Sequence, residues 1–125
     1  MVNLNELAKQ IHTKQVEKGF YEKPREIGTL LMLIVSELAE ALEADRKNKH
    51  SPNIDYLTDS WCAENKVIFK ESFELAVKDT FEDEIADAMI RLFDLVGNLN
   101  IDIEKHIELK LKYNDTRPYK HNKEY

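Results

Sequence analysis

The sequence predicts an all-α fold, and three observations lead to this prediction. Only three glycines and three prolines occur among the 125 residues, whereas hairpin turns need such residues for their backbone geometry. Apolar residues recur at helical spacing in several segments, with capping residues beside them. A hydrophobic fraction of 42% with 34% charged residues is typical of a globular domain. We therefore expect a single domain over residues 1–125, built as a four-helix bundle-like assembly.

The first two predicted helices cover residues 4–18 and about 25–46. Asn3 is a suitable N-cap for the first helix, and Gly19 is a suitable end for it. Pro24 suits the start of the second helix. The segment Leu30 to Val35 is apolar in every direction, which is typical of an enclosed helix. A monomer of this size has few elements to enclose it, so we expect a homo-oligomer, either a dimer or a tetramer.

Residues 47–70 interrupt the helical pattern. Ser51-Pro52-Asn53 signals a turn, but Trp61 and its apolar neighbours indicate a segment that packs on the body. We expect a semi-ordered insertion between the two acid-bearing helices, with a short helix as an option. A long helix is predicted to follow over about residues 71–97, ending at Gly97-Asn98. Asp102 can cap a last helix to about residue 113, and residues 114–125 form a polar, basic tail.

The charge distribution excludes some partners. Residues 1–108 carry a net charge of −9 and residues 109–125 carry +3, within a total of −6. An acidic body repels a nucleic-acid backbone, so no nucleic-acid polymer is expected as a partner. No apolar run approaches the roughly 20 residues of a membrane span, and the N-terminus lacks a signal-peptide pattern. Cys62 is the single cysteine, which favours a reducing cytoplasm and a buried or neutral thiol.

The candidate chemistry is in two pairs of acids, each three residues apart. Glu37 and Glu40 form the first pair, and Glu84 and Asp87 the second. Helical spacing puts the members of each pair on one face, among apolar neighbours that disfavour an isolated charge. Four carboxylates facing one another need a multivalent cation between them. Oxygen ligands without His or Cys favour Mg²⁺, with Mn²⁺ as a substitute.

The acid pairs are also compatible with other interpretations. Ordinary surface salt bridges are one, for example between Asp87 and Arg91 one turn later. A bundle di-iron site is excluded, because neither pair has the His three residues on that such a site uses. The tail offers two cations and an amide for an anionic ligand, namely Lys110, Arg117 and, one helical turn after Lys110, Asn114. These cations could instead complement a helix dipole or form a solvated end.

Together these residues resemble the MazG-like all-α nucleoside triphosphate pyrophosphohydrolases. The shared motifs, which extend from Ile27 to His121 without the insertion, are E-x-x-E (Glu37, Glu40), E-x-x-D (Glu84, Asp87) and K-x-x-x-N-x-x-R-P-Y-K-H (Lys110, Asn114, Arg117, Lys120, His121). The resemblance implies Mg²⁺-dependent hydrolysis of a nucleoside or deoxynucleoside triphosphate to the monophosphate and pyrophosphate. It also implies that the four acids are metal ligands, and that the tail holds phosphates. One departure is that 43 residues separate Glu40 from Glu84, more than the usual short connection.

The residues are consistent with that chemistry. Metal ions held by carboxylates neutralise phosphate charge, and an acid not fully engaged by metal accepts the proton of the attacking water. Either Glu37 or Glu40 suits this general-base role. The competing class is a noncatalytic helical regulatory or scaffold dimer, whose acid pairs are surface features only.

Overall fold

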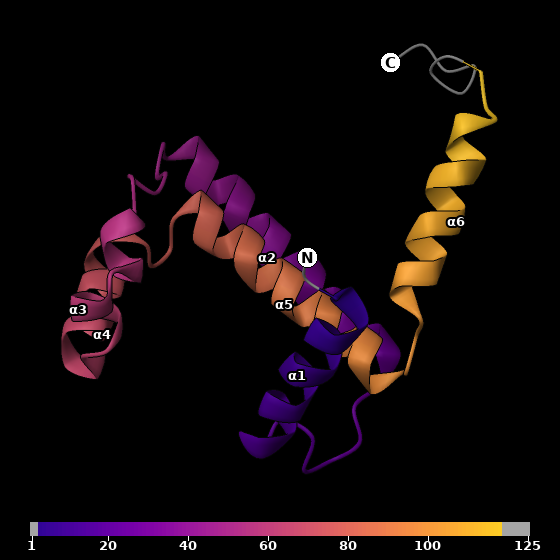
Figure 1. The fold of residues 1–125 in the computed structure, drawn as a ribbon, viewed down its shortest axis with the longest axis horizontal. Helices are drawn as coiled ribbons and strands as arrows, with labels where there is room; N and C mark the ends of the chain where they lie inside the picture. The colour runs from indigo at the N-terminus through magenta and orange to yellow at the C-terminus, as the bar shows by residue number, and fades with distance from the viewer. Residues whose placement is uncertain (1–2, 119–125) are drawn as a thin grey trace. The chain divides into compact units, whose positions relative to one another are not determined.

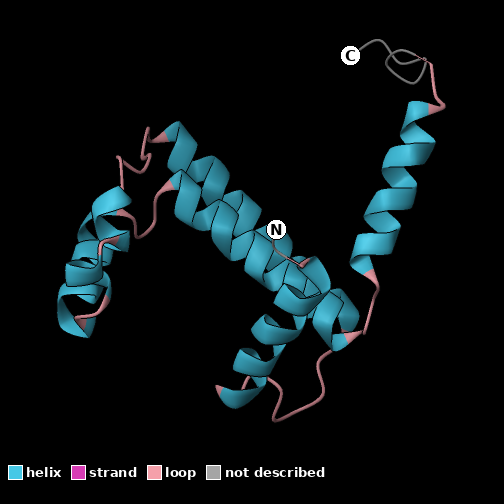
Figure 2. Ribbon diagram, viewed as in Figure 1, coloured by secondary structure: helices cyan, strands magenta, loops and turns pink. Residues whose placement is uncertain are grey.

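The computed structural model describes residues 3–118, and its regular structure is entirely helical over that range (Figures 1 and 2). The elements are α1 (Leu4–Glu17), α2 (Ile27–Arg46), the 3-10 helix η1 (Asp55–Thr58), α3 (Ser60–Ala63), α4 (Lys66–Ala76), α5 (Phe81–Asn98) and α6 (Ile103–Asp115). The predicted all-α class is therefore confirmed. The bundle arrangement and the oligomer remain predictions. None of the described helices is both long and apolar enough to cross a membrane.

Local capping explains where most helices begin and end. The Asn3 side chain accepts a hydrogen bond from the Glu6 amide at the start of α1, and Asp102 accepts one from the Lys105 amide at the start of α6. Gly19 adopts φ +88° just after α1, a left-handed conformation that side chains with a Cβ disfavour. These three predicted helix boundaries are confirmed to within a residue or two.

The long helix predicted over residues 71–97 is wrong, because α4 ends at Ala76 and α5 begins at Phe81. Asp79 has φ 65°, which no helix accommodates. Thr80 then caps α5, since its Oγ1 accepts a hydrogen bond from the Asp83 amide at 3.3 Å. Asp83 in turn accepts one from the Asp79 amide at 2.9 Å. Two side-chain hydrogen bonds at the start of α5 thus cap a new helix where a continuous one was expected.

The described chain divides into two compact units. Unit 1 contains the residues up to Pro24 and those from Phe93 onward, and unit 2 contains Arg25–Leu92. The single-domain interpretation stays a prediction, and each unit is considered by itself.

In unit 1, close packing of α1 on the end of α5 depends on a glycine. A Cβ on Gly97 would lie 2.5 Å from the Ala8 carbonyl oxygen and 2.8 Å from the His12 Cβ. Gly97 therefore permits this close helix contact. The predicted helix end at Gly97-Asn98 is confirmed, since α5 ends at Asn98. The left-handed residue that follows α5 is Asn100, with φ 53°.

Unit 1 is also pinned by side-chain contacts. Buried Asp94 on α5 accepts a hydrogen bond from the Tyr21 hydroxyl at 2.6 Å and lies 2.9 Å from Nδ1 of His12. The Asn5 amide nitrogen donates to Asp102 Oδ1 at 2.9 Å, which joins α1 to the start of α6.

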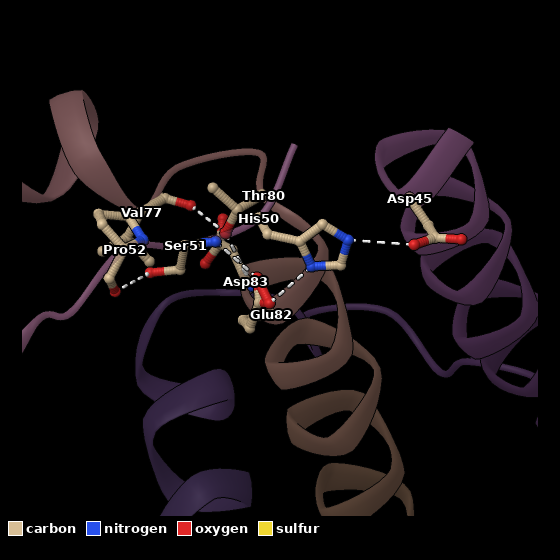
Figure 3. A network of polar contacts seen from close by, with 8 residues as sticks. All are labelled: Asp45, His50, Ser51, Pro52, Val77, Thr80, Glu82 and Asp83. Atoms are coloured by element: carbon tan, nitrogen blue, oxygen red, sulfur yellow. Dashed lines mark hydrogen bonds and ion pairs between the residues drawn. The ribbon is translucent and has the colours of Figure 1, made fainter. Parts of the chain in front are cut away.

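In unit 2, α2 and the first part of α5 run antiparallel, because the Phe81 amide donates to the Lys49 carbonyl oxygen just beyond the end of α2. Figure 3 shows the polar network at this junction. His50 Nε2 lies 3.0 Å from Asp45 on α2, and Nδ1 lies 3.1 Å from Glu82 on α5. The Ser51 amide also donates to Glu82, at 2.6 Å.

The predicted insertion, residues 47–70, contains η1, α3 and the start of α4. Its small core consists of buried Leu57, Cys62 and Val77, with Ile68 and Phe73 packed against them. Cys62 is thus a buried free thiol, as expected. Because this core includes residues on both sides of position 70, the inserted structure extends to the end of α4.

Candidate metal centre

The structure brings three of the four predicted acids together inside unit 2. Glu37 on α2 and Glu84 and Asp87 on α5 each offer an oxygen, and these oxygens all lie within 4.8 Å of one another. Glu40, the fourth acid, is exposed, but its carboxylate acts on the pKa values of Glu37 and Glu84 and so lies beside them. The two acid pairs therefore face each other between α2 and α5.

Small and apolar neighbours enclose this centre. Glu37 is 8% exposed and shares the buried face of α2 with Leu30, Ala41 and Ala44. Glu84 is 6% exposed, and Ala88 is buried one turn later on α5. Helical spacing in the sequence aligns Glu84 with the apolar residues Phe73 and Val77, but neither is on its helix.

Phe73 lies within α4, which spans Lys66–Ala76, and Val77 is the C-cap of that helix. Neither residue belongs to α5, so neither shares a helical face with Glu84. The alignment of residues 73, 77 and 84 on one continuous helix, which the apolar spacing of the sequence predicts, is wrong because the chain breaks between α4 and α5.

One buried oxygen in the centre has no partner. Among the described residues, Oε2 of Glu84 is buried and accepts no hydrogen bond. An unpartnered buried carboxylate oxygen is costly, because its hydration is lost without replacement. A bound cation would satisfy it, and without a cation a proton shared with the Glu40 or Glu37 carboxylate would do so.

The pKa values of the acids differ according to their surroundings. Burial, together with the neighbouring Glu40 and Glu37 carboxylates, raises the pKa of Glu84 from 4.5 to about 8. Burial also raises the pKa of Asp87, and the Asp83 and Glu37 charges add to this effect. For Glu37 burial acts upward too, but its hydrogen bonds, first of all with Arg91, lower the pKa overall. Without a cation, the centre retains a proton on Glu84 at neutral pH.

Arg91 is the residue of this centre to which sequence reasoning gave no site role. Its Nε donates to Glu37 Oε1 at 2.9 Å, so it pairs across to α2 rather than with Asp87 one turn back. Helical spacing places Arg91 on the same face as Glu84 and Asp87, but it does not indicate the partner on α2.

The donor set fits a hard divalent cation. Carboxylate oxygens alone favour Mg²⁺ or Mn²⁺ over zinc, and the partnerless Glu84 oxygen gives the ion a place to bind. A second group of carboxylate oxygens also lies within 4.8 Å of one another, and it comes from Asp79, Asp83 and Glu84. It shares Glu84 with the first group, so we treat it as the margin of the same centre.

The predicted phosphate-binding residues belong to unit 1. Lys110 and Asn114 are on α6, and Arg117 follows its C-cap. Lys110 and Arg117 both lie over the Tyr113 ring, with the charged groups 5.1 Å and 5.8 Å from its centroid. Lys120 lies outside the described residues. The phosphate-binding role of these residues stays a prediction.

Comparison of the chain with protein-family models, with curated proteins and with solved structures finds no match. The functional interpretation therefore depends on the residues and geometry of the centre itself.

Proposed function

We propose that the protein is a Mg²⁺-dependent pyrophosphohydrolase that cleaves a nucleoside or deoxynucleoside triphosphate to the monophosphate and pyrophosphate, as its resemblance to the MazG-like enzymes implies. The observation that carries this proposal is the enclosed cluster of Glu37, Glu84 and Asp87, with its partnerless oxygen. A structural ion pair would need as many cations as acids. Here one arginine faces four carboxyl groups, which favours a cation site.

The chain's residues divide the work of hydrolysis. Glu37, Glu84 and Asp87 would hold the ion, with Glu40 beside them. Bound Mg²⁺ would neutralise charge on the phosphates and polarise the phosphoryl group under attack. Glu40 is the better general base of the two candidates, because it is exposed whereas Glu37 is engaged by Arg91. It would take the proton of the water that attacks the α-phosphorus.

Assembly into a homo-oligomer is part of the proposal. Leu31, Val35, Leu38 and Leu42 lie on one face of α2 at spacings of four, three and four residues, and are 45–50% exposed. This is the spacing of helices that pair along an apolar seam. A two-fold dimer would cover the same seam from both subunits. The helix that carries Glu37 and Glu40 would then also be the interface helix.

A noncatalytic scaffold is the second candidate, and one observation favours it. Trp61 and Leu75 near the ends of α3 and α4 are 75% and 89% exposed, as they would be on a surface that binds another protein. Metal dependence separates the two candidates, because a scaffold has no reason to be stabilised by Mg²⁺ or Mn²⁺.

The deciding experiment is product analysis over a panel of nucleoside triphosphates, with Mg²⁺ and with Mn²⁺. We expect pyrophosphate release from at least one substrate. Release of orthophosphate with a diphosphate would rule out attack at the α-phosphorus. Inactivity over the whole panel with both metals would favour the scaffold.

A further inference from the structure

Arg91 lies within the carboxylate centre but uses little of its hydrogen-bonding capacity there. A guanidinium group has five N–H donors, and the contact with Glu37 Oε1 uses the one on Nε. The two terminal nitrogens have no hydrogen bond or ion pair to any other residue that the structure describes. Arg91 therefore keeps its end-on pair of amino groups open.

The two side chains of this contact also differ in their exposure to solvent. The Arg91 side chain is 38% exposed, whereas the Glu37 side chain that it contacts is 11% exposed. The guanidinium group thus reaches from an enclosed carboxylate to solvent. An arginine that served only to neutralise Glu37 would be expected to clamp both carboxylate oxygens with two N–H groups. The single Nε contact fixes the guanidinium plane and leaves the other edge free.

Charge explains what that free edge would bind. Four carboxyl groups and one divalent cation leave the centre negative, so a polyphosphate would be repelled unless a fixed positive charge lay nearby. Arg91 supplies that charge next to both acid pairs, because it contacts Glu37 and also acts electrostatically on Asp87. Paired N–H groups of arginine match phosphate oxygens in geometry as well as in charge.

We propose that Arg91 is a phosphate-binding residue of the carboxylate centre, with Nε held by Glu37 and its terminal amino groups available to a phosphate oxygen of the substrate. This inference rests on the proposed function, and assigns the polyphosphate a contact within unit 2. It does not require the tail residues of unit 1. A role limited to orienting Glu37 is the competing interpretation.

The test separates binding of metal from binding of phosphate. Arg91→Gln and Arg91→Lys are compared with the parent, and Arg46→Gln, at an exposed arginine of α2, controls for the loss of one positive charge in unit 2. Each protein is titrated by calorimetry with Mn²⁺ alone, and then with pyrophosphate in the presence of saturating Mn²⁺. Circular dichroism checks that each variant is helical.

We expect Arg91→Gln to weaken pyrophosphate binding about ten- to hundredfold, as for the loss of a charge-assisted contact, while its Mn²⁺ affinity changes by less than about threefold. Arg91→Lys keeps the charge but loses the paired donors, so an intermediate value is expected. Arg46→Gln should match the parent. Because Arg91→Lys preserves the cation, it keeps the test available should Arg91→Gln fail to fold.

Two results would overturn the inference. One is parental pyrophosphate affinity in Arg91→Gln, with or without weaker Mn²⁺ binding, since Arg91 would then act on Glu37 alone. The other is a parent protein that binds Mn²⁺ and has no measurable affinity for pyrophosphate. A parent that binds no Mn²⁺ would instead contradict the proposed function, so the two failures are distinguishable.

Discussion

The two faces of α2 reverse the usual rule for a helix. On one face Glu37 is 8% exposed among buried Leu30, Ala41 and Ala44. On the other, four large apolar residues are 45–50% exposed: Leu31, Val35, Leu38 and Leu42. A helix on the surface of a monomer normally buries its leucines and exposes its carboxylates.

The proposed function accounts for this reversal. Opposite the carboxylate face of α2, the buried Oε2 of Glu84 on α5 has no partner, and on the other face four large apolar side chains are half-exposed. In the proposal a cation would bind at the first and a second subunit would cover the second. The predictions below alter one face at a time.

The largest effect is expected on the carboxylate face. Glu84→Gln keeps the shape of the side chain but removes a ligand charge, so it should abolish metal-dependent turnover. It should also remove stabilisation by metal, which for the parent is about 2.7 kcal/mol at a metal concentration one hundred times the Kd. Thermal denaturation with and without Mn²⁺ measures this loss. Glu40→Gln, which removes the proposed general base beside the ion, should abolish turnover but keep most of the metal stabilisation.

Glu71→Gln, at an exposed position of α4, is the matched control and should retain activity and metal stabilisation. Without metal, we expect Glu84→Gln to be as stable as the parent at neutral pH, and slightly more stable above about pH 8, where Glu84 of the parent is ionised and its loss relieves repulsion between carboxylates. Full activity of Glu84→Gln would contradict the metal assignment, and full activity of Glu40→Gln would contradict the general-base assignment.

The apolar face is altered by Leu38→Glu, which puts a charge in the middle of the proposed seam. Light scattering at micromolar concentration should show an oligomeric parent and a monomeric variant with reduced activity. Leu38 is half-exposed within one chain, so a monomeric parent would lose only about 0.5 kcal/mol or less. Thr29→Glu, at an exposed polar position of α2, should leave assembly unchanged. A fully active monomeric parent would contradict the proposed interface.

The carboxylate face should also give metal-free stability a distinctive pH dependence. The pKa of Glu84 is raised from 4.5 to about 8 by burial and by the Glu40 and Glu37 carboxylates. Its contribution to stability is therefore fully present below pH 4.5 and is lost as the pH rises through 8. Between these values the free energy of unfolding should fall by up to about 1.4 kcal/mol per pH unit relative to Glu84→Gln. Urea titrations of the two proteins across this pH range measure the difference. Parallel curves of unfolding free energy against pH would contradict the raised pKa of Glu84.

The smallest effect is expected at the junction beyond the end of α2. This junction belongs to neither face of the helix, so it serves as a reference for the other predictions. Glu82 and Asp45 raise the pKa of His50 above 6.5, and only the protonated ring can donate to both carboxylates. The stability that His50 contributes is thus fully present below pH 6.5 and is lost as the pH rises through the raised value. His50→Gln should lower the melting temperature slightly below pH 6.5 and converge with the parent at high pH. A constant difference at every pH would argue against this network.

The helices were largely predictable, whereas one break was not. The helix boundaries at Asn3, Gly19 and Asp102 could be predicted, because caps and glycines act locally. The break before α5 has no glycine or proline, and it depends on Asp79 adopting a left-handed conformation. The capping pattern of Thr80 and Asp83 was the available signal, but it lies inside a segment with apolar helical spacing.

The centre was predictable in its acids but not in its arginine. The spacing of Glu37, Glu84 and Asp87 among apolar residues indicated a shared, enclosed face. For Arg91, helical spacing favoured the local partner Asp87, whereas the structure pairs it with Glu37, 54 positions away in sequence. A contact between helices depends on their packing register, which local spacing does not contain.

The central claim is that the buried carboxylates are held for a divalent cation, and proton release on metal binding tests it most directly. At pH 7 the metal-free centre keeps a proton on Glu84, whose pKa is about 8, and a bound cation must displace it. Calorimetric titration with Mn²⁺ in buffers of different ionisation enthalpy measures the protons released. We predict release of close to one proton per site at pH 7, less above pH 8, and none in Glu84→Gln. No Mn²⁺ binding at millimolar concentration, or binding with no proton released at pH 7, would contradict the claim.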